Sequence, residues 1–141
     1  MEAITNEARI DASPSKVYEA ISTHDGFRGW WTKDCDVDAR EGGEAEFRFD
    51  QGKVAMRFRF DRLDPGKAVR MTCIGNKNNE EWQGTTLSFD LEPQGGSATT
   101  VHFRHDGWAR KSQCYDQCVG GWSHFMNSLK GYVETGTGAP F

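Results

Sequence analysis

Between residues 35 and 103, apolar and polar side chains alternate along one short stretch after another. In EAEFRFD, for example, Ala45, Phe47 and Phe49 alternate with charged residues. A period of two indicates β-strands, because successive side chains of a strand point to opposite faces of a sheet. The pattern therefore predicts a sheet with one covered, apolar face and one solvated, polar face. The other alternating stretches carry Cys35 and Val37; Val54, Met56, Phe58 and Phe60; Val69, Met71 and Cys73; Leu87, Phe89 and Leu91; and Val101 and Phe103.

Short segments rich in Gly, Pro, Asn and Asp separate these stretches. Such segments form tight turns, and they lie at residues 41–43, 51–52, 64–66, 75–76 and 93–96. Neighbouring strands that are joined by tight turns run antiparallel. We therefore expect a mainly antiparallel sheet of six or seven strands, in which residues 3–11 form the first strand.

Two short helices are expected directly after the first strand. In SPSKVYEAIS (13–22), Ser13 suits the N-cap and Pro14 suits the first helical position. Two glycines interrupt the next segment, HDGFRGWW (24–31), so it predicts only one or two helical turns. These turns would carry the bulky side chains of Phe27, Trp30 and Trp31.

A longer helix is predicted near the C-terminal end, over about residues 112–134, where apolar side chains recur at helical spacing. Its length is about 30 Å, and Gly136 is suited to ending it. Gly120 and Gly121 predict a local bend or a close approach to the sheet, with a hinge as the alternative. Since no other segment is long enough, this helix is expected to cover the apolar face of the sheet. Its apolar stripe consists of Trp122, Phe125, Leu129, Tyr132 and Val133.

Length and charge limit the classes of function. A chain of 141 residues predicts one domain, residues 1–141, with a core of its own. The formal net charge of −4 argues against a nucleic-acid partner, which requires a clustered basic face. No apolar run approaches the length of a membrane span. The N-terminal residues lack the apolar core of a signal peptide, so we expect a cytoplasmic protein.

The four cysteines do not predict a disulfide framework. Cys35 and Cys73 fall on apolar faces of strands and are expected to be small buried hydrophobes. Cys114 and Cys118 share one face of the predicted helix, but their Cβ atoms would be too far apart for a relaxed disulfide. A zinc site would need two further ligands. We expect structural cysteines and neither metal nor cofactor, with a redox thiol pair as the alternative.

Four stretches carry a resemblance to a known family. They are ASPSKVYEAIS (12–22), GWWT (29–32), HDGW (105–108) and GWSHFMNSLKGYVETG (121–136). Together with the order of the expected elements, these stretches resemble the START-like or SRPBCC superfamily, which includes the birch pollen allergen. Within it they resemble the branch related to the C-terminal domain of the heat-shock protein 90 ATPase activator. The resemblance implies an α+β helix-grip fold, in which a curved antiparallel sheet of six to seven strands surrounds the long C-terminal helix.

The resemblance also implies a function, although less closely than a fold. Members of this superfamily bind lipids, sterols or polyketide-like molecules in an apolar cavity, and a few are cyclases. We expect this chain to bind a small hydrophobic molecule between the sheet and the C-terminal helix; the alternative is an interior that side chains fill completely. The predicted ligand-binding residues are Trp30, Phe47, Met56, Phe58, Phe60, Met71, Phe89, Phe103, His105, Trp122, Phe125 and Met126.

The sequence favours binding over catalysis. It contains no recognised nucleophile or metal-hydrolase motif, and we predict no catalytic residue. His105 continues the alternation of Val101 and Phe103, so it should point inward near a strand end. There it could orient a ligand or act as a general base. A cyclase or hydrolase that uses His105 is therefore an alternative.

A third possibility is a protein partner or a homodimer, since the related activators bind a chaperone. Trp30 and Trp31 would point about 100° apart on a helix, so we do not expect both to be buried. With Trp108 they would form an exposed contact patch, a gate over the cavity, or a small core beneath residues 24–33.

Overall fold

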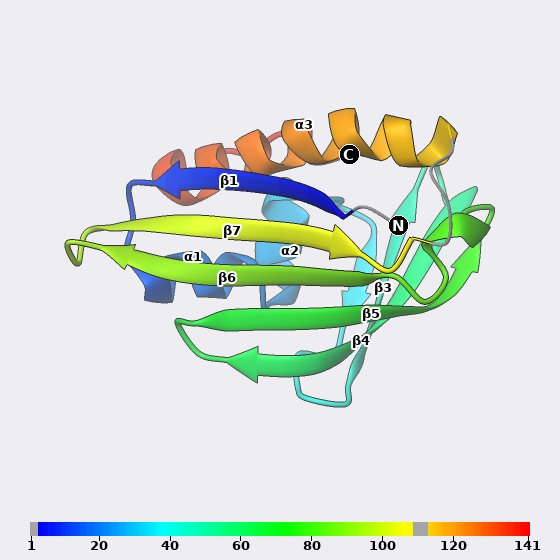
Figure 1. The fold of residues 1–141 in the computed structure, drawn as a ribbon, viewed down its shortest axis with the longest axis horizontal. Coiled ribbons are helices and arrows are strands. Elements are labelled where there is room, and N and C mark those ends of the chain that lie inside the picture. The colour runs from blue at the N-terminus through cyan, green and yellow to red at the C-terminus, as the bar shows by residue number, and fades with distance from the viewer. Residues whose placement is uncertain (1–2, 109–112) are drawn as a thin grey trace.

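A seven-stranded antiparallel sheet is the main layer of this computed structural model, which describes residues 3–108 and 113–141 (Figure 1). The strand order across the sheet is β1-β7-β6-β5-β4-β3-β2. The predicted antiparallel sheet of six or seven strands is thus confirmed. The strands are β1 (Ile4–Ile10), β2 (Cys35–Val37), β3 (Glu44–Phe49), β4 (Val54–Asp64), β5 (Ala68–Lys77), β6 (Thr86–Gln94) and β7 (Ala98–Asp106).

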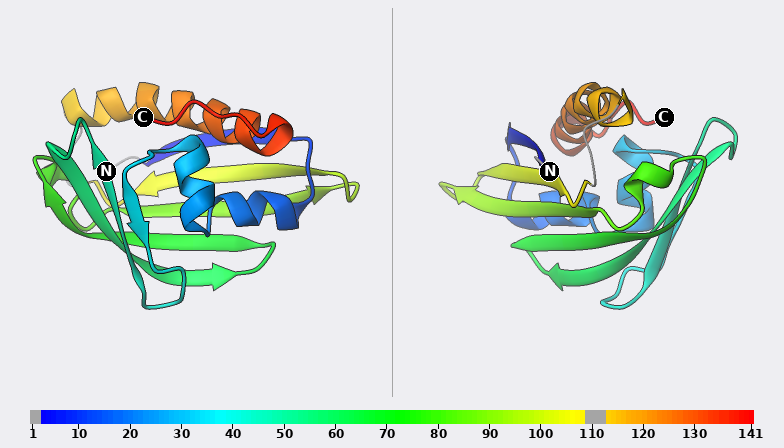
Figure 2. Two further views of the ribbon diagram at one scale, coloured as in Figure 1. Left: turned by 180° about the vertical axis from the view of Figure 1, so that it is seen from behind. Right: turned by 45° about the vertical axis from the view of Figure 1, so that its right-hand side comes forward.

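The sheet is strongly curved, and all helices of the described chain lie on its inner side. Figure 2 shows β3 and the beginning of β4 rising steeply relative to β6 and β7, whereas the end of β4 runs alongside β5. The register of β4 against β5 shifts between Arg57 and Phe58 and again between Phe60 and Arg62. Such irregularities bend and twist a sheet locally. A cavity lies at the adjoining ends of β3 and β4, and it forms the candidate site.

The helices are α1 (Pro14–Ala20), α2 (His24–Trp30), the short 3-10 helix η1 (Glu80–Trp82) and α3 (Gln113–Thr135). The Ser13 hydroxyl accepts a hydrogen bond from the Lys16 amide at 3.3 Å, which confirms the predicted N-cap. Gly136 follows α3 with φ +85° and confirms the predicted stop. Figure 1 shows α3 running along the open side of the sheet beside β1.

The two faces of the sheet differ as predicted. The apolar side chains of the strands are buried against the helices, and the outer face carries ion pairs. Arg48 is the centre of one such cluster, since it donates hydrogen bonds to Asp34, Asp36 and Glu46 at 2.6–2.9 Å. Because the charges on this face are paired locally, the outer face does not form a uniform basic surface. Within the described residues, no helix is both long enough and apolar enough to span a membrane.

Two structural cysteines are where the sequence predicts them. Cys35 and Cys73 are buried, and burial raises the pKa of the Cys73 thiol to about 11. The side chain of Cys114 lies outside the described residues, so a thiol pair with Cys118 stays a prediction. Among the described residues, no three His, Cys, Asp or Glu side chains are close enough together to hold a metal ion.

One predicted turn is wrong. Strand β5 continues through Gly75 and Asn76 to Lys77, where the sequence predicted a turn. A Cβ atom on Gly75 would lie 3.3 Å from the Arg57 guanidinium. The glycine therefore serves close contact with a side chain of the neighbouring strand rather than chain reversal.

The expectation that Trp30 and Trp31 would not both be buried is also wrong. Trp30 is 0% exposed and Trp31 is 1% exposed, and their rings stack at a centroid distance of 5.8 Å. The end of α2 is inserted between α3 and the curved sheet, so it is enclosed on several sides. Trp30 contacts Phe89, whereas Trp31 contacts Phe47 at 4.2 Å. Trp108 is buried too, and the three tryptophans form no exposed patch.

Candidate functional site

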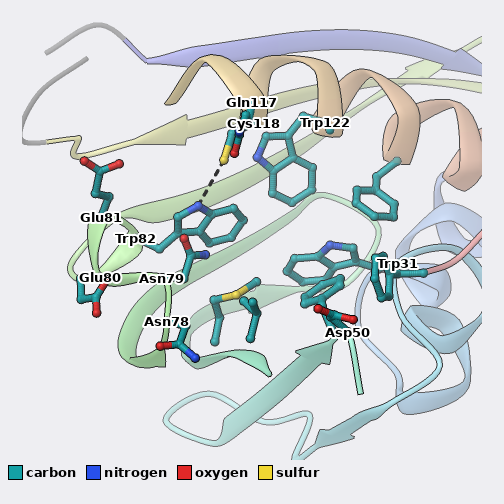
Figure 3. A pocket seen from close by; sticks show the side chains of 16 residues that line it. Trp31, Asp50, Asn78, Asn79, Glu80, Glu81, Trp82, Gln117, Cys118 and Trp122 are labelled. Carbon is teal, nitrogen blue, oxygen red and sulfur yellow. Dashed lines mark hydrogen bonds between the residues drawn. The ribbon is translucent and has the colours of Figure 1, made fainter. Parts of the chain in front are cut away.

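A cavity of about 850 Å³ opens between the first half of α3, η1 and the adjoining ends of β3 and β4 (Figure 3). Its volume is within the range of small-molecule binding sites. The cavity is open to solvent on one side, and six of its sixteen lining residues are aromatic. The lining residues are Trp31, Phe49, Asp50, Val54, Met56, Asn78, Asn79, Glu80, Glu81, Trp82, Gln117, Cys118, Gly121, Trp122, Phe125 and Phe141.

Three tryptophans from three different elements form the inner wall. Trp31 follows α2, Trp82 ends η1 and Trp122 belongs to α3. The Trp122 ring lies 5.4 Å from that of Trp31 and 5.9 Å from that of Trp82, between centroids. Each ring thus supports the next, so the wall is preorganised.

Three phenylalanines form the opposite end of the cavity. Phe49 contacts Phe125 at 6.4 Å and Phe141 at 5.3 Å between ring centroids. Residues 136–141 run back beside α3, and the Phe141 amide donates to the Trp31 carbonyl at 2.8 Å. Phe141 itself is 59% exposed, so it forms the outer edge of the cavity.

The rim of the cavity is polar and carries carboxylates. Asp50, Glu80 and Glu81 contribute acidic groups. Among the residues that the structure describes, none of those lining the cavity is Lys or Arg. Asp50 and Asn78 have φ of +53° and +59°, a conformation that Asp and Asn tolerate better than most residues. At Asp50 and Asn78 the rim is therefore formed by turns whose local geometry suits these residue types.

Gly121 leaves part of the cavity empty. A Cβ atom on Gly120 or Gly121 would have no heavy atom within 4 Å. The expected close approach of helix and sheet at these glycines is therefore wrong. Helix α3 continues through both residues, and Gly121 borders the cavity where a larger side chain would project into it.

His105 is buried behind the tryptophan wall rather than on the cavity surface. The Trp122 indole N–H donates to His105 Nδ1 at 3.0 Å. This places the ring proton on Nε2, which donates to the Thr85 hydroxyl at 2.9 Å. The Thr85 hydroxyl donates in turn to the Trp82 carbonyl at 2.6 Å. Burial lowers the pKa of His105 to about 3, so the ring is neutral.

This geometry gives His105 a positioning role. Both ring nitrogens are used in holding Trp122 and, through Thr85, the segment that carries Trp82. An imidazole with both nitrogens engaged and no exposed surface has no lone pair available to act as a general base. The alternative of an enzyme that uses His105 therefore has no support from the geometry.

Three of the twelve predicted ligand-binding residues line the cavity: Met56, Trp122 and Phe125. The structure places the other nine in the surrounding core, where they pack behind the wall. Contact between these residues and a ligand stays a prediction. The nine are Trp30, Phe47, Phe58, Phe60, Met71, Phe89, Phe103, His105 and Met126.

Sequence reasoning missed several lining residues, above all Trp82, Phe141 and Cys118. Trp82 lies in the polar segment EEWQG, outside any alternating stretch, so no periodicity marks it as inward-facing. Its indole N–H donates to Cys118 Sγ at 3.2 Å, which joins η1 to α3 at the cavity edge. A lone Trp within a polar loop was the available signal.

A curved antiparallel sheet around a C-terminal helix, with a cavity between them, defines a helix-grip protein. The family model described as activator of Hsp90 ATPase homolog 1-like protein matches residues 11–134. The chain belongs to this family, as the resemblance in its sequence predicts. No curated protein is similar enough to the sequence to count as a match.

Solved structures agree with this assignment. The solution structure of the Aha1 dimer from Colwellia psychrerythraea is 36% identical over 98% of this chain and 100% of that chain, with a TM-score of 0.86. Protein CV1439 from Chromobacterium violaceum is 25% identical over 95% of this chain and 99% of that chain, with a TM-score of 0.73. The AHSA1-like protein from Aeromonas hydrophila is 18% identical over 96% and 94%, also with a TM-score of 0.73, and shows the same fold.

Proposed function

We propose that this protein binds a small, mainly apolar molecule with a ring system in the cavity beneath α3. The observation that carries the proposal is a preformed cavity of about 850 Å³ with six aromatic side chains in its wall. Aromatic rings offer large, rigid contact surfaces to other rings. Side chains from η1, β3, β4 and α3, with Trp31 directly after α2, form the walls, and we expect a ligand to contact all of them.

The expected affinity is moderate. Burying about 300 Å² of apolar ligand surface contributes roughly 7 kcal/mol at about 25 cal/mol per Å². The loss of translational and rotational freedom offsets part of this gain, so we expect a dissociation constant of about micromolar at best.

A pair of neighbouring glycines provides a sharp test. Gly121→Leu would project a side chain into the cavity, whereas Gly120→Leu adds the same side chain beside the cavity. Both replacements remove a helix glycine and should raise helix stability by about 0.5–1 kcal/mol. The neutral probe N-phenylnaphthylamine, followed by its fluorescence, should bind the wild type and Gly120→Leu alike. The probe should bind Gly121→Leu at least about tenfold more weakly, which is a loss of roughly 1.4 kcal/mol in binding free energy.

Equal binding to both variants would show that the probe binds elsewhere. Absence of saturable binding to the wild type, with no adduct in native mass spectrometry of protein purified gently from its host, would contradict the proposed function.

Self-association is a second candidate function, because the similar protein from Colwellia psychrerythraea is described as a dimer. Val119 on α3 is 47% exposed and Phe141 is 59% exposed, and they are the large exposed hydrophobic residues of the described chain. We propose that the exposed side of α3 at Val119 meets a second copy. Sedimentation velocity should show a dimer that Val119→Lys weakens; a monomer at all concentrations would contradict this candidate.

Two further expectations belong to the proposal. Action on a chaperone, suggested by the family description, ranks below ligand binding, as no described feature favours it over the cavity. A cytoplasmic location is supported by the buried thiols of Cys35 and Cys73, which suit a reducing compartment.

A further inference from the structure

The charge of the cavity rim narrows the class of ligand. Asp50 and Glu80 are exposed acidic residues at the mouth, and the described lining residues include no cationic side chain. A bound carboxylate, such as that of a fatty acid, would have no cationic partner among these residues and would meet like charges at the rim. A positive charge would be attracted there, although solvent screens the attraction.

The wall beneath the rim also suits a cation. Six aromatic rings line the cavity, and Trp31, Trp82 and Trp122 among them pack ring against ring with only 1–6% of their surface exposed. The faces of aromatic rings carry partial negative charge and attract organic cations, and tryptophan does so most strongly. Ring faces and carboxylates thus favour the same sign of charge at adjacent places in the cavity.

An indole N–H that faces the cavity adds a separate feature. Among the described residues, the Trp31 indole N–H has no hydrogen-bond acceptor, and neither does the buried N–H of Trp108, whereas those of Trp30, Trp82 and Trp122 each have one. Trp31 is 1% exposed, and Figure 3 shows its nitrogen turned toward the α3 side of the cavity. The N–H is therefore available to donate to a molecule bound in the cavity. A ligand oxygen placed there would satisfy it.

We propose that the cavity selects an organic cation: an amine or quaternary ammonium on an aromatic or otherwise apolar body that also carries an oxygen acceptor. The apolar body would lie against the tryptophan wall and the charged group near Asp50 and Glu80. This inference rests on the proposed function, because it names the ligand class of the same cavity.

The test compares three ligands that share one ring system and differ in charge. They are naphthylmethyl-trimethylammonium, naphthylmethanol and naphthylacetate, with affinities measured by isothermal titration calorimetry. At low ionic strength the cation should bind about tenfold more tightly than the anion, with the alcohol between them. Added salt should reduce this preference.

Variants that remove one carboxylate charge test which residues cause the preference for the cation. Asp50→Asn keeps a residue type that tolerates φ +53°, and Glu80→Gln keeps the side-chain size. Each should reduce the preference for the cation by roughly threefold, the size of a solvent-exposed ion pair. Asp25→Asn is the matched control, because Asp25 lies on α2 outside the cavity lining. This variant should leave the preference for the cation unchanged.

The possible outcomes distinguish the inferred preference for cations from the proposed ligand binding itself. Equal affinities for all three ligands, or tighter binding of the anion, would overturn the inference while leaving ligand binding in place. A cation preference that neither variant reduces would overturn the role given to these carboxylates. No binding of any ligand, nor of the neutral probe, would contradict the proposed function itself.

Discussion

The imidazole of His105 connects the cavity wall to the sheet without touching the cavity. It accepts from the Trp122 indole and donates to Thr85, so its two nitrogens fix the direction of the whole hydrogen-bond chain. Protonation of His105 Nδ1 would place a second N–H opposite the Trp122 indole N–H, and neither donor would then have an acceptor. The folded state therefore requires a neutral ring.

This requirement predicts a dependence of stability on pH. The pKa of His105 is lowered to about 3 in the folded protein, while the unfolded chain titrates near the ordinary value of 6.5. Between these values the unfolded state binds one more proton, so stability falls as the pH falls. From pH 7 to pH 5, urea unfolding should show a loss of about 2 kcal/mol from this residue.

The variant to compare is His105→Gln, which cannot titrate. Between pH 7 and pH 5 its free energy of unfolding should fall by about 2 kcal/mol less than that of the wild type. His102 acts in the opposite sense, because its hydrogen bond to Glu92 raises its pKa. Its stabilising contribution is present at low pH and is lost as the pH rises. Parallel pH profiles for the wild type and His105→Gln would contradict the assignment.

At the level of elements, α2 is held close to α3 by a glycine. A Cβ atom on Gly29 would lie 2.2 Å from a ring carbon of Tyr132, so the ring occupies the space that a side chain would need. The Ser128 hydroxyl of α3 also donates to the Trp30 carbonyl at 2.7 Å. These contacts set the position of Trp31 in the cavity wall.

Gly29→Ala is expected to destabilise the protein by about 1–3 kcal/mol, because Tyr132 or the helix must move. Gly120→Ala, on α3 with open space around it, should instead stabilise by about 0.5–1 kcal/mol. Thermal or urea unfolding measures both. Equal effects of the two alanines would show that α2 and α3 are not packed as described.

The elements themselves were largely predictable from the sequence. Alternation in β3, β4, β6 and β7 and the N-cap at Ser13 depend on local spacing, which a sequence displays directly. The burial of both Trp30 and Trp31 depends on where α2 is inserted, and local spacing does not show this.

The cavity was predictable as a general feature but not in detail. Met56, Trp122 and Phe125 lie on patterned elements, and all three line the cavity. Trp82 comes from the short 3-10 helix η1 and Phe141 from the segment after α3, and tertiary contacts place both at the cavity. Inward-facing Phe103 packs against Trp122 and Phe89 packs against Trp30, so both lie in the core behind the cavity wall.

For the whole molecule, ligand binding should appear as increased stability. The unfolded chain lacks the assembled wall, so a ligand binds the folded state alone and stabilises it by mass action. At a ligand concentration of about 100 times the dissociation constant, the gain is about 2.7 kcal/mol. Thermal unfolding with N-phenylnaphthylamine should therefore show a melting temperature that rises with probe concentration.

Gly121→Leu should show almost none of this rise, while Gly120→Leu should follow the wild type. The same rise in both variants would mean that the probe stabilises the protein from another site.

The backbone hydrogen bond from Phe141 to Trp31 has a practical consequence for handling the protein. Anything attached after residue 141, such as an affinity tag or a fluorescent fusion partner, would emerge at the mouth of the cavity. A flexible tag rich in histidine would add titratable charge beside the acidic rim, and a bulky fusion would restrict entry. Affinities measured with such attachments would then describe the attachment as well as the protein.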